Sequence, residues 1–270
     1  MKTLFTWFNT LFNNRRFLKR ERLNSHLPWV VSLSLGPKND VDDMFFENKP
    51  CIDKAQKYLP FNDKEFEQWV KPSIEHIANH YLYLPNDKEH YCKPGGAFEN
   101  SINSAMYAAM LINTQTHDLY NKIDGEYRNQ YKTTCPLAVF LFALIQYTGR
   151  ALSDYKVLAC DKRGVVNNSI TAWNPVKETL YDWVKVNGVK YYIKQDNSDG
   201  KGDEHKIYIY KFVFKFDNII KTFQYSELLD MQLSQMLSND DDQLTRKLLK
   251  LVEEGNKKSQ DYYLNVVAQI

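Results

Sequence analysis

The chain has 270 residues, of which 43% are hydrophobic and 25% are charged, and its formal net charge is +2. With only 10 glycines and 9 prolines, it cannot be collagen-like or a Pro/Gly-rich low-complexity protein. The near-neutral balance gives by itself no argument for nucleic-acid binding, and no run of about 18 apolar residues predicts a transmembrane helix.

The first 23 residues are predicted to form an amphipathic basic segment. Its apolar side chains fall on one helical face, and a basic stretch follows them: Leu4, Phe5, Phe8, Leu11, Phe12, then Arg15, Arg16, Lys19, Arg20 and Arg22. Two interpretations remain open. The segment is either a terminal helix or flexible tail of the protein, or a peripheral membrane contact through residues 1–22.

The next segments predict a helical first half. Turn-forming residues in 24–50 predict an irregular lead-in. A helix is expected from about Asn62, with Glu65 as its capping-box partner. A loop through Pro94, Gly95 and Gly96 then leads into a helix at about 98–114.

The apolar segment 135–149 predicts a buried central helix, with Pro136 in its first turn. A short helix and the strand-like VKYYIK follow, and 226–252 predict two helices separated at 238–242. An aromatic stripe in 207–216 predicts a strand whose side chains either join the core or stack on bases. The fold class expected is therefore α+β, mostly α, with a helical core and a smaller mixed α/β C-terminal part.

The four cysteines, Cys51, Cys92, Cys135 and Cys160, lie far apart and form no C-x-x-C pair. This spacing disfavours a zinc ribbon or a thioredoxin-type site. No small-residue cleavage site follows the first apolar stretch, so we expect a cytoplasmic protein with reduced thiols, membrane-associated if residues 1–22 bind lipid.

Two stretches carry a family resemblance: YLPNDKEHYCKPGGAFENSINSA at 83–105 and AVFLFALIQYTGRALSDYKV at 138–157. With the later Trp-Asn-Pro at 173–175, they resemble the N-terminal domain of TraI-like relaxases of the MOBH class, which process DNA in conjugative elements. That domain is similar to HD-type metal-dependent phosphohydrolases. The resemblance covers 45–200 and implies an HD-like helical core, with a strand and C-terminal helices in 201–270 packed on it.

The resemblance also implies a metal site, and the ligand positions differ here. His90 and Asp154 remain, whereas Asn100 replaces a histidine and Gln146-Tyr147 replaces the His-Asp pair. Amides are neutral donors that bind transition metals weakly, so we expect no metal cofactor. We expect Asn100 and Gln146 to hydrogen-bond directly, with His90 nearby and the Tyr147 ring filling or flanking the former pocket.

The glycine pair Gly95-Gly96 has two interpretations. It could open a phosphate-binding helix N-terminus, which is weakly indicated without a P-loop lysine, or it is a tight turn that needs glycine conformations.

The function expected is that of a degenerate relaxase-like protein of a mobile or conjugative element, a non-catalytic module that binds DNA or a protein of the conjugation apparatus. The alternative is an active, metal-dependent DNA-nicking relaxase or phosphohydrolase that uses Mn or Fe at a rearranged site. Its candidate ligands are His90, Asp154, His205 and the doublet His117-Asp118.

Overall fold

The computed structural model describes residues 29–32, 37–86, 90–115, 119–120, 123–146, 155–196 and 222–267. The basic segment 1–23 and the aromatic stretch 207–216 lie outside the described residues.

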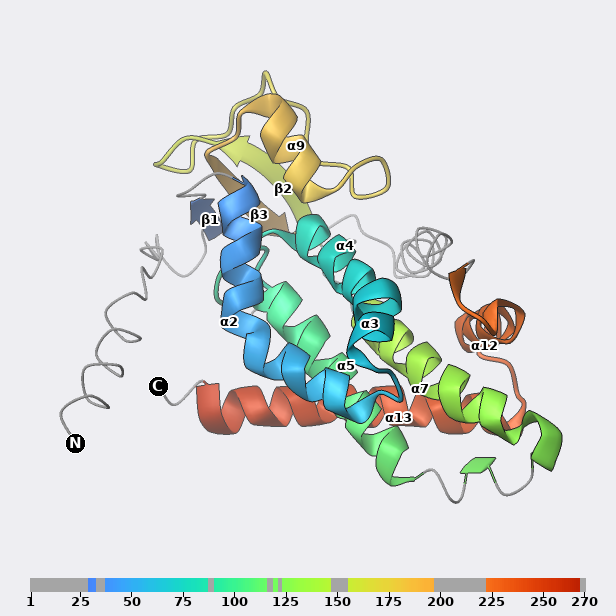
Figure 1. Cartoon of the computed structure of the whole chain (residues 1–270). Coiled ribbons are helices and arrows are strands. Elements are labelled where there is room, and N and C mark those ends of the chain that lie inside the picture. Colours follow the sequence, from blue (N-terminus) through green and yellow to red (C-terminus); the bar gives the residue numbers. More distant parts are fainter. Residues whose placement is uncertain are drawn as a thin grey trace.

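The described chain is mostly helical, with a small antiparallel sheet, which confirms the expected mostly-α α+β class. Helix α5 lies at the centre, α2 and α7 pack on it, and α13 crosses it, as Figure 1 shows. The sheet and α9 gather at one end of the molecule. In chain order the elements are β1 (Trp29–Ser32), α2 (Pro37–Tyr58), α3 (Asp63–Glu65), the π-helical turn η1 (Phe66–Val70), α4 (Lys71–Tyr81), α5 (Gly96–Thr114), α7 (Gly125–Gln146), β2 (Tyr155–Cys160), α9 (Leu180–Asn187), β3 (Tyr191–Asp196), α12 (Ser226–Ser238), α13 (Gln243–Tyr262) and the π-helical turn η2 (Tyr263–Val267).

The capping box predicted at the start of the α3–α4 helical run is present. The Asn62 side chain accepts from the Glu65 amide, and the Glu65 carboxylate accepts from the Asn62 amide. Pro72 does not end this run, because it lies in the first turn of α4, where a missing N–H is tolerated.

The expected irregular lead-in at 24–50 is wrong for most of its length. Helix α2 begins at Pro37 and continues through Pro50 to Tyr58. Tertiary packing overrides the turn-forming residues, because Met44 and Ala55 are buried where α2 packs against α5. An exposed Lys49–Asp53 ion pair (3.0 Å) also links successive turns on either side of Pro50.

The apolar helix is confirmed as buried, but its predicted start is wrong. Helix α7 begins at Gly125, so Pro136 lies inside it rather than in its first turn. In the turn before the proline, the hydroxyls of Thr133 and Thr134 donate to the carbonyls of Asn129 and Gln130, four residues earlier in the helix. Every residue from 134 to 145 is buried.

The sheet has the order β1-β3-β2, with both pairings antiparallel. Strand β3 and helix α9 were predicted, and both are present. Strand β2 was not predicted, and it pairs along β3 from Tyr155 opposite Asp196 to Cys160 opposite Tyr191. Lys194, in the middle of β3, therefore lies opposite both Trp29 and Val157.

Helices α12 and α13 match the pair predicted for 226–252, although α13 continues to Tyr262. Asp242 caps α13, and its carboxylate accepts from the amides of Leu244 and Thr245. Helix α13 crosses α5 at Gly255, where a Cβ would lie 2.8 Å from the Ala108 nitrogen and 2.9 Å from the Ser104 carbonyl oxygen. The absence of a side chain at Gly255 thus sets how closely these helices approach.

Among the described helices, none combines the length and the apolarity that crossing a bilayer requires.

Cys135 is buried and Cys51 is half-buried, and both thiols are expected to be alkylated slowly. Burial raises the pKa of Cys51 to about 12, and Lys54 and Glu99 act on it in opposite directions. Burial likewise raises the pKa of Cys135 to about 12, against hydrogen bonds that include one from Gln232.

We therefore expect Cys51 and Cys135 to react with iodoacetamide at pH 8 more than about tenfold more slowly in the folded protein than in 6 M guanidinium, because the thiolate is the reacting form. Peptide mass spectrometry after timed alkylation measures this. Equal rates at Cys135 in both states would contradict the buried position of this side chain in α7.

Candidate functional site

The segment between α4 and α5 has an unusual backbone. Leu82, Tyr83 and Tyr91 have φ angles of 27°, 45° and 52°. Left-handed conformations are costly for residues with bulky side chains and persist where the surroundings fix them. All three side chains are buried. The structure therefore fixes the backbone at Leu82 and Tyr83, directly after α4, and at Tyr91, ahead of α5.

The glycine pair forms the corner at which this segment enters α5. Gly95 precedes the helix with φ +79°. At Gly96 a Cβ would lie 1.8 Å from the Tyr91 carbonyl oxygen, so the two backbones touch. The Ala97 amide in the first turn of α5 donates to the Leu84 carbonyl (2.9 Å). This corner needs Gly95 for its conformation and Gly96 for its close approach.

Asn100, one turn further along α5, is the centre of a buried polar cluster. Its amide group donates to Asn86 Oδ1 (3.4 Å), and its Oδ1 accepts from Ser259 Oγ (3.1 Å) and lies 3.4 Å from Ser104 Oγ. Ser104 Oγ also lies 3.3 Å from Asn256 Oδ1. We call these five residues the Asn100 network. It joins the turn at Asn86 to α5 and to α13.

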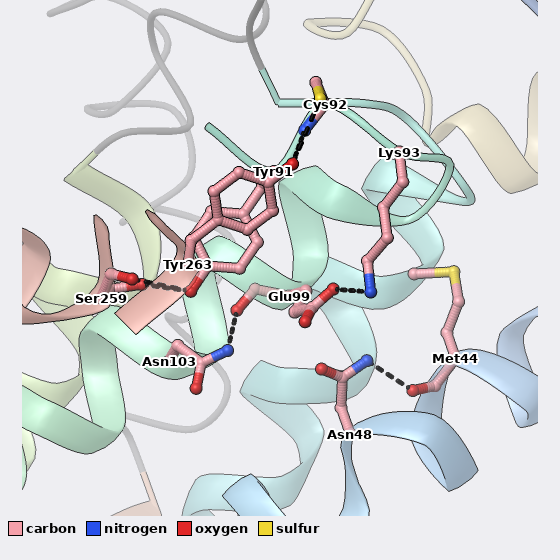
Figure 2. A network of polar contacts seen from close by, with 9 residues as sticks. All are labelled: Met44, Asn48, Tyr91, Cys92, Lys93, Glu99, Asn103, Ser259 and Tyr263. Atoms are coloured by element: carbon pink, nitrogen blue, oxygen red, sulfur yellow. Dashed lines mark hydrogen bonds and ion pairs between the residues drawn. The ribbon is translucent and has the colours of Figure 1, made fainter. Parts of the chain in front are cut away.

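Tyrosine side chains extend the network on the α13 side, as Figure 2 shows. The Tyr91 hydroxyl lies 2.9 Å from Ser259 Oγ and 3.0 Å from the Ser259 carbonyl oxygen. The Tyr91 ring packs on the Tyr263 ring at 4.5 Å between centroids. The Tyr263 hydroxyl in turn lies 3.1 Å from Cys92 Sγ. The loop ahead of Gly95 is thereby attached to the end of α13.

Charged groups hold the loop from two other directions. Lys194 of β3, only 6% exposed, donates its ammonium protons to the carbonyls of Pro85 and Asn86. Lys93 in the loop pairs with Glu99 on α5 at 2.7 Å, an ion pair drawn in Figure 2. Burial raises the pKa of Tyr91, so this phenol stays protonated and neutral at physiological pH. The amides and hydroxyls of the Asn100 network are neutral too, so Tyr91 adds no charge to the network through Ser259.

The structure places His90 beside the Asn100 network but does not form the hydrogen bond expected between Asn100 and Gln146. His90 is half-buried beside the network, and the Asn86 side chain donates to the His90 carbonyl (3.5 Å). The expected hydrogen bond between Asn100 and Gln146 is not formed. Asn100 instead bonds Asn86, Ser104 and Ser259, and Gln146 Oε1, at the end of α7, has no hydrogen-bond partner in the described structure.

The reason is that α13 supplies better placed partners. Gly255 lets α13 approach α5 closely, and Ser259, one turn later, then reaches Asn100. Tyr147, Asp154, His117, Asp118 and His205 lie outside the described residues. Within the described ranges, no three His, Cys, Asp or Glu side chains form a group that could hold a metal ion.

Several residues of the site were missed in the sequence: Asn86, Ser104, Lys194, Asn256 and Ser259. A sequence pattern on α13 could have indicated Asn256 and Ser259. On the buried face of α13 the large residues Leu248 and Val252 are followed by the small or polar Gly255, Asn256 and Ser259 at helical spacing. Small and polar residues on an otherwise apolar face indicate a close, hydrogen-bonded contact. No comparable signal marks Lys194, because a lysine in a strand is usually exposed.

The comparisons with known proteins give one family. Residues 37–270 match the sequence model of the TraI_2 family, whose description reads "Putative helicase". The comparison with curated proteins finds no match.

Proposed function

We propose that this chain, which belongs to the TraI_2 family, is a relaxase-like domain related to conjugation that binds DNA or a protein of a mobile element without cleaving DNA. Membership of a TraI-like family supports the conjugation-related part of this proposal. The Asn100 network supports the non-catalytic part.

The observation that carries the proposal is the state of the Asn100 amide. This side chain occupies the position of a histidine in the relaxases that the sequence resembles, and it is 2% exposed. Its oxygen accepts from the hydroxyl of Ser259 and faces that of Ser104, so both lone pairs have a donor within reach. An amide oxygen engaged in this way offers little to a cation, and its neutral partners supply no charge to offset one.

The sequence gives no support for a P-loop helicase activity in this chain. ATP-driven unwinding in P-loop enzymes depends on the motif G-x-x-x-x-G-K-[ST], whose backbone amides and lysine bind the phosphates. None of the 10 glycines in the sequence begins such a motif.

Metal content and nicking activity test the non-catalytic part. We expect the natively purified chain to hold less than about 0.1 equivalents of any transition metal. The measurement is informative because a structural or catalytic site binds its ion tightly enough to retain it during purification. We also expect no relaxation of supercoiled plasmid with added Mn²⁺ or Mg²⁺. Inductively coupled plasma mass spectrometry and gel electrophoresis measure the two quantities.

Stoichiometric Mn, Fe or Zn that is lost in His90→Ala and kept in the control variant His76→Gln, at a half-buried histidine of α4, would overturn the proposal. It would favour instead the rearranged metal site considered from the sequence. A separate test is the triple variant Asn100→His, Gln146→His and Tyr147→Asp, which places at these positions the metal ligands of the relaxases that the sequence resembles. Since Asn100 and Gln146 are not bonded to each other, we expect this variant to gain little metal affinity and to be less stable.

The binding part is tested with labelled oligonucleotides. If the chain binds DNA, fluorescence anisotropy will show an affinity for single- or double-stranded DNA that falls steeply with salt, as counterion release requires. If neither form binds at 50 mM salt, the DNA part of the proposal fails and a protein partner remains.

A further inference from the structure

A groove that shares no residue with the Asn100 network lies between the start of α7, helix α12 and the start of α13. Its volume is about 560 Å³. Most of its lining is apolar or aromatic, with Asp124 and Gln130 as the polar exceptions: Ile123, Asp124, Tyr127, Gln130, Tyr131, Leu228, Met231 and Leu244.

Two of the lining side chains are exposed although they are large and apolar. Tyr127 on α7 is 51% exposed and Met231 on α12 is 42% exposed. Leu228 and Met231 are three residues apart on α12 and therefore share one helical face. Apolar side chains from two helices that meet at an open groove are typical of a surface that binds a partner.

The two stretches of sequence that line the groove carry more acidic than basic residues. Residues 123–132 and 226–247, the two stretches that supply its lining, contain seven carboxylates against two guanidinium groups and the two lysines Lys132 and Lys247. Asp124 lines the groove itself, and Asp242 caps α13 two residues before Leu244. The carboxylates are Asp124, Glu126, Glu227, Asp230, Asp240, Asp241 and Asp242.

The two guanidinium groups are engaged by the chain itself. Arg246 pairs with Asp241 at 2.8 Å, and Arg128 donates to the Ile123 carbonyl at 3.3 Å. With Lys132 and Lys247 also counted, the seven carboxylates outnumber the basic groups by three, so the region keeps a net negative charge. This charge pattern repels phosphate backbones and anionic lipid surfaces, and it attracts a cationic partner.

We propose that this groove binds a basic amphipathic helix of a partner protein. An apolar floor flanked by carboxylates matches a helix whose apolar residues recur at i, i+3, i+4 and i+7 and whose other positions carry Lys or Arg. The proposal deepens the binding role proposed above by naming the class of partner, and it rests on that role.

The test uses the full chain and two synthetic helical peptides. Both have the same Leu/Phe stripe, and their remaining positions are Lys/Arg in one and Glu in the other. We expect the basic peptide to bind at least about tenfold more tightly in fluorescence anisotropy, and its affinity to fall with added salt.

Variants of exposed residues locate the binding without disturbing the core. The double variant Tyr127→Ser and Met231→Ser should weaken binding of the basic peptide about tenfold or more, since exposed apolar anchors carry much of such an affinity. The matched control is Val186→Ser on α9, a 78% exposed apolar side chain outside the groove, which should leave the affinity unchanged. The double variant Asp124→Asn and Asp230→Asn should reduce the salt dependence.

Three results overturn the proposal: no binding, equal binding of the acidic peptide, or binding that the Tyr127 and Met231 substitutions leave unchanged. A photo-reactive benzoylphenylalanine placed at Tyr127 distinguishes the occupants. Cross-links to the added peptide support a partner helix, whereas cross-links to residues 1–22 assign the groove to the chain's own basic segment and overturn a separate partner. Failure here leaves the DNA-binding part untouched, because the oligonucleotide measurement does not involve the groove.

Discussion

Gly96→Ala is expected to destabilise the fold by about 3 kcal/mol or more, because overpacking against a backbone atom cannot be relieved by a side-chain rotation. The added Cβ would lie 1.8 Å from the Tyr91 carbonyl oxygen and 2.6 Å from its carbonyl carbon. The loop from Tyr91 to Gly96 or the start of α5 must then shift. Chemical denaturation followed by circular dichroism at 222 nm measures the free energy of unfolding.

The matched control is Gly125→Ala. Gly125 is also the first residue of a long helix, and a Cβ there meets no atom within 4 Å. We expect this change to be neutral or to stabilise by up to about 1 kcal/mol, as for other glycines whose conformation alanine can adopt. If Gly96→Ala were as stable as Gly125→Ala, the tight corner ahead of α5 would be incorrect.

The substitution Gly96→Ala should also disturb the hydrogen bonds of the Asn100 network. Tyr91 is fixed by its carbonyl contact with Gly96 on one side and by its hydroxyl contact with Ser259 on the other. A displaced Tyr91 moves its ring away from Tyr263. We therefore expect Gly96→Ala to change near-ultraviolet circular dichroism, which reports fixed aromatic rings, at temperatures where the far-ultraviolet signal is still native.

Gly255→Ala is the second substitution with a large expected effect. In an exposed helix this change would stabilise by about 1 kcal/mol, because alanine is the better helix former. Here the Cβ would lie 2.8 Å from the Ala108 nitrogen, 2.9 Å from its Cβ and 2.9 Å from the Ser104 carbonyl oxygen. Two of these atoms are backbone, so the helices must move apart, and we expect a net loss of about 2–3 kcal/mol.

Separation of α13 from α5 would also lengthen the hydrogen bonds from Ser104 to Asn256 and from Ser259 to Asn100. Gly255→Val should therefore be worse than Gly255→Ala, and Lys257→Ala, at an exposed position on α13, should be close to neutral. Thermal denaturation of the three variants gives the order of their Tm values. A Gly255→Ala protein with an unchanged or raised Tm would show that α13 does not approach α5 as closely as described.

Local sequence determined the elements whose signals are short-range. The Asn62–Glu65 capping box, the apolar residues of α7, the αL glycine Gly188 that ends α9, and the break between α12 and α13 each depend on a few neighbouring residues. Motif order was sufficient to indicate a TraI-like family, which the match over 37–270 confirms. Local patterns failed at Pro37–Tyr58, where burial of Met44 and Ala55 against other helices outweighs the turn formers. They also failed at the start of α7, because Gly125–Thr133 are helical without a buried side chain among them.

The tertiary structure alone decided which polar groups meet. The sequence placed Asn100 in a site with Gln146, whereas Asn100 bonds Ser259, 159 residues later in the chain, and Asn86 on the opposite side of the corner. Lys194 reaches the same corner from β3. Such contacts depend on how closely two helices cross and on which strand lies beside a loop. Those distances are set by packing of the whole core. Gly255 contributes to this packing because it has no side chain to hold α13 and α5 apart.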